Sequence, residues 1–142
     1  MISGCSDTFK EINIKESLMQ NLNFKIELAT KSLTSLHEIL SEPYSLIIRD
    51  AILFRFKCSV EIFWKLMKDY LFVHEGVVCE SPKSCMRTAF KVGLMDEEYT
   101  VKALEMIDLR LKNEHAYHEE IAEEIYRQVG ITGNLWMRFA GG

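Results

Sequence analysis

Apolar residues recur at every third or fourth position along most of the chain, which is the spacing of one face of an α-helix. The first stripe predicts a helix from about Lys15 to Ser41, with a seam made of Leu22, Ile26, Ala29, Leu33, Leu36 and Leu40. The second predicts a helix from about Tyr44 to Glu75, with a stripe made of Leu53, Phe56, Val60, Phe63, Met67 and Leu71.

The second stripe is wider than a single packed face requires. Four further apolar residues flank it: Phe54, Cys58, Ile62 and Trp64. A helix that is apolar on more than one side is buried on more than one side. We therefore expect residues 44–75 either at the centre of a helical bundle or in a subunit interface.

Three shorter helices are predicted in the second half, over Pro82–Val92, from about Asp96 to Leu111 and from about His118 to Val129. The residues at their borders are the usual helix-end residues, with Ser81-Pro82 at a start and Gly76 and Gly93 just past ends.

Gly130 and Gly133 predict that the last helix stops near them. The apolar residues that follow show no clear periodicity. We expect irregular structure in residues 131–142 and 1–14, and a core over about residues 15–130. The fold predicted for the single domain 1–142 is an all-α, antiparallel up-and-down bundle of about five helices.

Composition supports the helical prediction. The 142 residues are 48% hydrophobic, which excludes intrinsic disorder, and the 7 Gly and 2 Pro are too few for the many tight turns of a β-sandwich or barrel. No apolar run approaches the roughly 18 to 20 residues of a membrane span. The first residues lack the basic and apolar regions of a secretory signal, so we expect a cytoplasmic location with no membrane association.

The four cysteines are Cys5, Cys58, Cys79 and Cys85, and no two of them form a C-x-x-C pair. His74 with Cys79 and Cys85 could be drawn as three metal ligands, but the spacing matches no common zinc site. We therefore expect free thiols in a reducing compartment, no bound metal and no cofactor.

The net charge of −4 argues against bulk electrostatic binding to nucleic acid but leaves room for a local site. Lys83, Arg87 and Lys91 stand four residues apart and are candidates to contact RNA or an acidic partner, although such a stripe is more often a solvated helix face. The acidic run from Glu119 to Glu124 is expected to be a solvated face at a helix start.

Reactive side chains are densest between the last two predicted helices, where Arg110, His115 and Tyr117 follow one another. An Arg can hold a phosphate and stabilise the charge of its transition state, and a His can move a proton near neutral pH. Such a pair could cleave a phosphodiester without a metal. The alternative is structural: a surface Arg, a His at a helix end and a half-buried Tyr.

The runs Arg49–Phe56 and Glu61–Leu71 resemble the second helix of the HEPN nucleotidyltransferase-substrate-binding family. The resemblance extends over about residues 18–127. It continues through Ser81-Pro82, Arg87–Phe90, Gly93-Leu94, the Arg110–His115–Tyr117 motif, Glu119-Glu120 and Ala122–Tyr126.

The resemblance implies a helical homodimer that pairs with a minimal nucleotidyltransferase encoded by an adjacent gene. In several such toxin–antitoxin pairs the HEPN chain is a metal-independent RNase, which the nucleotidyltransferase silences by adenylylating the motif tyrosine. Carried over by position, Arg110 and His115 would be the catalytic pair and Tyr117 the modified residue. Two copies of the motif would meet in a cleft at the dimer interface.

The sequence departs from the family pattern in three places. Leu111 stands where a polar residue is usual, and Glu114 stands where a small residue is usual. The charge of Glu114 would oppose an approaching phosphate. The predicted turn at Gly130 and Gly133 lies where the last helix of the family usually continues.

Three functions follow from these observations. The first is a binding protein that presents a substrate or Tyr117 to a minimal nucleotidyltransferase. The second is an endoribonuclease toxin that uses Arg110 and His115. The third is a structural helical dimer without chemistry of its own.

Overall fold

The structure, a computed structural model, describes residues 3–140, and it describes side chains for residues 10–132. Its elements are α1 (Ser3–Leu40), α2 (Leu46–Glu75), α3 (Pro82–Lys91), α4 (Glu97–Lys112), the short 3₁₀ helix η1 (Asn113–His115) and α5 (Glu119–Ala140). Residues 3–140 contain no strand. The all-α helical bundle predicted from the sequence is confirmed.

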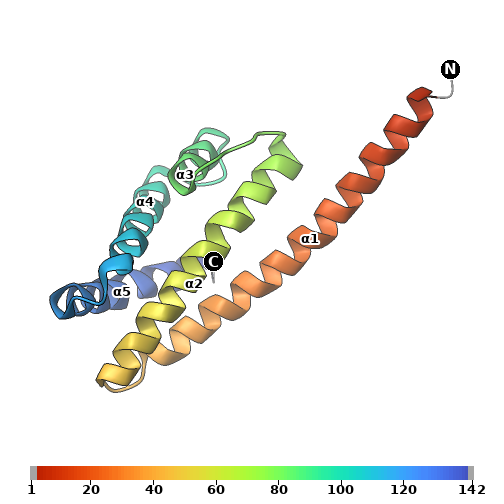
Figure 1. The fold of residues 1–142 in the computed structure, drawn as a ribbon. Coiled ribbons are helices and arrows are strands. Elements are labelled where there is room, and N and C mark those ends of the chain that lie inside the picture. The colour runs from red at the N-terminus through yellow and green to blue at the C-terminus, as the bar shows by residue number, and fades with distance from the viewer. Residues whose placement is uncertain (1–2, 141–142) are drawn as a thin grey trace.

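Helix α2 is the centre of the bundle. It runs antiparallel to α1, and it also contacts α3, α4 and α5 (Figure 1). This arrangement confirms one of the two expectations for its wide apolar surface. The N-terminal turns of α1 extend past the C-terminal end of α2, so they lie beyond the bundle (Figure 1).

The core follows the predicted stripes with one exception. Leu22, Ala29 and Leu36 of α1 are buried, whereas Ile26 is 43% exposed. The buried apolar residues of α2 are Ile52, Leu53, Phe56, Val60, Met67 and Leu71. Helix α5 contributes Ala122, Ile125 and Val129, which close the core at the other side.

The predicted helix ends are confirmed where the chain enters and leaves α2, α3 and α4. Ser81 accepts a hydrogen bond from the Ser84 amide at 3.2 Å, and Asp96 accepts one from the Tyr99 amide at 2.8 Å. Gly76 follows α2 with a φ of 66°, a left-handed conformation that favours glycine.

Two predicted ends are wrong. Helix α1 begins at Ser3 instead of near Lys15, and α5 continues to Ala140 through Gly130 and Gly133. Glycine weakens a helix by about 1 kcal/mol relative to alanine but keeps its backbone N–H, so the hydrogen-bond ladder can run through it. The third departure from the family pattern is therefore removed.

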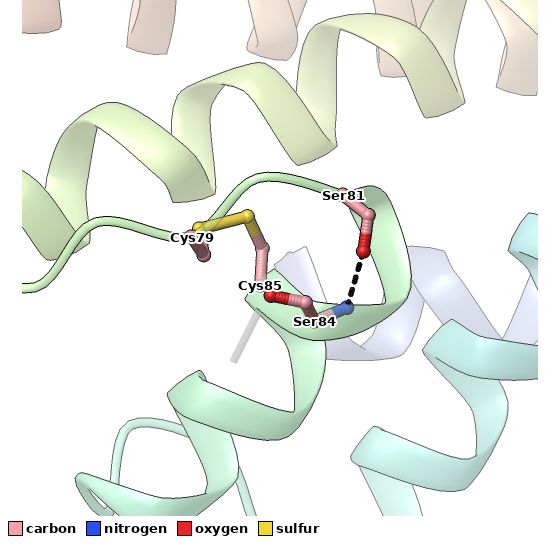
Figure 2. The surroundings of a disulfide bond; sticks show 4 residues. All are labelled: Cys79, Ser81, Ser84 and Cys85. Atoms are coloured by element: carbon pink, nitrogen blue, oxygen red, sulfur yellow. Dashed lines mark hydrogen bonds between the residues drawn. A yellow bond between two sulfur atoms is a disulfide. The ribbon is translucent and has the colours of Figure 1, made fainter.

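The prediction of free thiols is also wrong for two of the cysteines. Cys79, in the segment between α2 and α3, forms a disulfide with Cys85 in the first turns of α3 (Figure 2). Both residues are buried, and the bond closes a loop around the Ser81 cap. Two of the three candidate metal ligands are thus bound to each other. Cys58 is a free thiol, and the side chain of Cys5 lies outside the described residues.

Within residues 3–140, no helix combines the length and the apolar character needed to cross a lipid bilayer.

Candidate functional site

The candidate residues lie at the joint between α4 and α5. Arg110 is in the last turn of α4, His115 ends η1, and Tyr117 is in the connection that leads into α5. Asn113 ties this joint to the centre of the bundle, because its side-chain amide donates a hydrogen bond of 2.9 Å to the carbonyl of Leu53 in α2. The motif is therefore held on a packed element and not on a free loop.

His115 and Tyr117 form one pair. The Nδ1 atom of His115 lies 3.3 Å from the hydroxyl oxygen of Tyr117, and the two rings meet edge to face with centroids 6.0 Å apart. The ring of His118 also lies against Tyr117, with centroids 4.5 Å apart. Tyr117 is nevertheless 76% exposed, so a second molecule can reach its hydroxyl.

Arg110 is held by carboxylates. Its Nε atom lies 2.7 Å from Oε1 of Glu61 in α2, and its Nη1 atom donates a hydrogen bond of 2.9 Å to Oε1 of Glu114. The same Glu114 oxygen lies 3.7 Å from the ammonium group of Lys57. Two cations, Arg110 and Lys57, therefore compensate the negative charge of Glu114.

The Nε atom of Arg110 is buried and makes no hydrogen bond to the described residues, although the Glu61 oxygen is near. The Glu61 oxygen at 2.7 Å is its ionic partner, so the contact is an ion pair. Among residues 10–132, no hydrogen bond or ion pair joins Arg110 to His115 or Tyr117. His115 thus pairs with Tyr117, whereas Arg110 pairs with Glu61 and Glu114.

A buried arginine that the sequence analysis gave no role fixes the start of α5. Arg49 is 5% exposed and lies at the beginning of α2. It binds both Glu119 and Glu123, the latter at 2.9 Å, and it also pairs with Asp50. The side chain of Glu119 is 67% exposed and that of Glu123 is 36% exposed, so these glutamates lie at the surface as predicted but also bind Arg49. The signal was present, since Arg49 stands four residues before Leu53 on the buried stripe.

The hydrogen bonds around Arg49 shift the pKa values of three groups, Arg49, Glu123 and Tyr44. The hydrogen bonds that Arg49 donates to Glu119 and Glu123 raise the pKa of Arg49 above its ordinary value, so it is charged at any accessible pH. Tyr44 donates a hydrogen bond to Glu123, and this bond, followed by the one from Arg49, lowers the pKa of that carboxyl. The same bond raises the pKa of the Tyr44 phenol.

The three residues of the basic stripe on α3 differ in their surroundings. Lys83 pairs with Asp108 of α4, whereas Arg87 and Lys91 are exposed on α3. Contact of these three residues with RNA or a partner remains a prediction.

A pocket of about 240 Å³ opens beside Arg110, where α2, α3 and α4 meet. Its lining is mostly apolar and consists of Val60, Trp64, Pro82, Ile107 and Leu111 together with Glu61, Ser81, Lys83 and Arg110. The indole N–H of Trp64 donates a hydrogen bond of 3.3 Å to Glu61, which sets the orientation of the ring. Residues 10–132 contain no group of three or more His, Cys, Asp and Glu side chains placed to hold a metal ion.

Comparison with known proteins identifies the family. Residues 22–132 match the family described as nucleotidyltransferase substrate binding protein like. A crystal structure of a protein from Thermus thermophilus is similar, with 37% sequence identity and a TM-score of 0.72, and the match covers 80% of this chain and 96% of that one. No curated protein matches the chain. Since the family match spans well over half of its length, this chain belongs to the nucleotidyltransferase substrate-binding protein-like family.

Proposed function

We propose that this chain is a homodimeric partner of a minimal nucleotidyltransferase and presents Tyr117 for nucleotidyl transfer. The observation that carries the proposal is the pair of His115 and Tyr117. The tyrosine hydroxyl is exposed, and a histidine nitrogen lies 3.3 Å from it.

The geometry suits a base-assisted attack by the phenol. Tyrosine ordinarily ionises near pH 10, so attack at neutral pH benefits from a nearby proton acceptor. With its own proton on Nε2, His115 can take the phenolic proton on Nδ1. The tyrosine oxygen then forms a bond to the α-phosphorus of ATP, and the bond from that phosphorus to the leaving oxygen breaks, which releases pyrophosphate. The partner enzyme would supply ATP and its magnesium ion.

Exposed apolar side chains near the joint support the homodimer. Phe54 is 67% exposed and directly follows Leu53, the residue whose carbonyl anchors Asn113. Leu46 and Ile47 at the start of α2 are also exposed. Aromatic and aliphatic residues in one area of surface are typical of subunit interfaces.

The test combines co-purification with mass spectrometry. The chain is expressed with the nucleotidyltransferase of the adjacent gene, ATP is added, and the mass of each tryptic peptide is measured. We expect a complex and one adenylate on Tyr117. Tyr117→Phe should remove the modification, and Tyr126→Phe, a half-buried tyrosine of α5, should keep it. Absence of both complex and modification would contradict the proposal.

A second candidate function is a metal-independent RNase that uses Arg110 and His115. It is favoured by the exposed imidazole of His115 and by the placement of Arg110 on the same joint. Cleavage of RNA in the presence of a chelator, lost in His115→Ala, would support it. If neither RNA cleavage nor adenylylation is found, the third function, a structural helical dimer, remains.

A further inference from the structure

We propose that a second pocket, between the end of α1 and the middle of α5, binds a small organic acid through its carboxylate. The pocket has a volume of about 250 Å³. It shares no lining residue with the pocket beside Arg110 and does not include Tyr117, so the proposal goes beyond the proposed function and does not depend on it. Its lining consists of His37, Leu40, Ser41, Tyr126, Arg127 and Gly130.

Gly130 is the feature that points to a ligand. It lies inside α5, where glycine is less favourable than any residue except proline. Its φ is not positive, and a Cβ atom at this position would meet no packed atom within 4 Å, so neither the backbone nor the packing of the described residues requires a glycine. A longer side chain would lean over the preceding turn, which carries Tyr126 and Arg127, and would enter the pocket. The glycine therefore keeps the pocket open.

The polar groups of the pocket suit an anion. Among residues 10–132, no Asp or Glu lines it, and Arg127 and His37 have no hydrogen-bond or ion-pair partner. The Ser41 hydroxyl is already donated to the carbonyl of Glu38 at 2.8 Å, so Arg127 and His37 are the donors that a ligand would use. The planar guanidinium matches the two oxygens of a carboxylate, and an imidazole N–H can donate a further hydrogen bond.

The charges around the pocket favour a carboxylate over a phosphate. Glu38 and Glu42 are exposed and each directly follows a lining residue, and Glu123 lies one turn before Arg127 on α5. The guanidinium of Arg127 balances one negative charge of a ligand. The second charge of a phosphate would be opposed by the neighbouring carboxylates.

The rest of the lining indicates that the acid has a compact apolar body. Leu40 is half-buried, and the ring of Tyr126 is held edge to face against Tyr44, with centroids 5.3 Å apart. The volume is below the range of roughly 300 to 1,000 Å³ typical of sites for drug-sized molecules. We therefore expect an acid of about the size of benzoate, either free or as the C-terminal residue of a peptide.

The experiment titrates the full chain, labelled with ¹⁵N, with benzoate and with the peptide Gly-Gly-Phe. Benzamide and the peptide amide are the uncharged controls, and inorganic phosphate is the doubly charged one. We expect an acid to shift the amide signals around Gly130 and the uncharged controls to bind at least about tenfold more weakly. Tighter binding of benzoate would identify a free acid as the ligand, and tighter binding of the peptide would identify a peptide C-terminus. Phosphate that binds more tightly than both acids would overturn the assignment to a carboxylate.

Arg127→Gln tests the proposed donor at an exposed position where folding does not depend on it. It should weaken binding of the tighter acid at least about tenfold, because the ligand loses its charged partner. Lys31→Gln is the matched control, since it removes a positive charge from an exposed position of α1 outside the pocket. It should change the affinity less than about twofold.

Gly130→Leu tests the open floor of the pocket. The leucine should weaken binding at least about tenfold and raise the Tm by about 2 to 4 °C, because it fills the pocket and is a better helix former than glycine. Gln128→Leu, at an exposed position of α5 outside this pocket, is the control. If Gly130→Leu lowers the Tm instead, the result for Arg127→Gln decides. No binding of either acid, or an affinity that Arg127→Gln leaves unchanged, would overturn the proposal.

Discussion

The Nδ1 atom of His115 lies 3.3 Å from the hydroxyl of Tyr117, while the guanidinium of Arg110 is held by Glu61 and Glu114 on the side of α2. The three motif residues therefore have two sets of polar partners. One of them can activate a tyrosine, and the other borders a pocket.

Replacement of His115 by alanine should slow adenylylation of Tyr117 roughly a hundredfold, because the phenol loses the nearby proton acceptor. The initial rate of adenylate incorporation by the partner enzyme measures the effect. His118→Ala is the matched control, since His118 contacts the same ring but is not hydrogen-bonded to the hydroxyl. A rate for His115→Ala equal to that of the control would show that His115 is not the base.

Glu114→Gln should raise RNA cleavage about threefold to tenfold if the chain is an RNase, because it removes a negative charge from the guanidinium of Arg110. The glutamine keeps the size of the side chain and can still accept the hydrogen bond. Glu124→Gln is a control, since Glu124 pairs with Lys112 and not with Arg110. Equal cleavage by both variants would mean that Glu114 does not restrain Arg110.

Arg49→Met should lower the free energy of unfolding by about 2 kcal/mol, since it removes hydrogen bonds between charged groups that hold α2 to α5. Urea denaturation followed by circular dichroism measures this loss. Arg127→Ala, at an exposed position of α5, should change stability by less than about 0.5 kcal/mol. A loss no greater than that of Arg127→Ala would contradict the structural role of Arg49.

Acid should weaken the ion pairs around Arg49, because it protonates the carboxylate of Glu123. The pKa of this carboxyl is lowered in the folded chain from its ordinary value of 4.5, so its stabilising contribution is present above that value. The contribution is lost as the pH falls through the lower, folded pKa. Urea unfolding at pH 7 and pH 3 should show a larger acid loss for the natural chain than for Glu123→Gln. The same loss in both chains would exclude Glu123 as a source of the acid sensitivity.

Replacement of both Cys79 and Cys85 by serine should cost about 2 kcal/mol, because the disulfide closes a short loop and restricts the unfolded chain. Denaturation of the oxidised natural chain and the double variant gives the difference. Cys58→Ser serves as the control for loss of a free thiol. A natural chain whose stability is unchanged by dithiothreitol would show that the bond contributes little.

The helices could be predicted because periodicity, caps and helix-end glycines all act locally. Ser81 with Pro82 and Asp96 mark starts by satisfying backbone amides within the first turn, and Gly76 ends α2 through a conformation that few other residues adopt. The helix end predicted at Gly130 is wrong, because a glycine ends a helix only where the backbone leaves the helical conformation. At Gly130 the backbone stays helical.

The partners of the site residues could not be predicted, because they come from distant segments. Nothing local in the sequence indicates that Glu61 reaches Arg110, that Lys57 lies near Glu114, or that Asn113 binds a carbonyl of α2. The pairing of Cys79 with Cys85 depends on the turn into α3 that brings their Cα atoms to 5.2 Å. The types of the motif residues could be read from the sequence. Which polar partners each of them has depends on the packing of α4 against α2.

The disulfide also links thiol chemistry to the pocket. Ser81, Pro82 and Lys83 all line the pocket, and all three lie inside the covalent ring that Cys79 and Cys85 close. Opening the ring would loosen one wall, so a ligand that prefers the closed wall must, by thermodynamic reciprocity, also protect the bond from reduction. A ligand bound in the pocket should therefore shift the reduction equilibrium of the bond toward the disulfide, and the oxidation state of two buried sulfur atoms would set how strongly the chain holds that ligand.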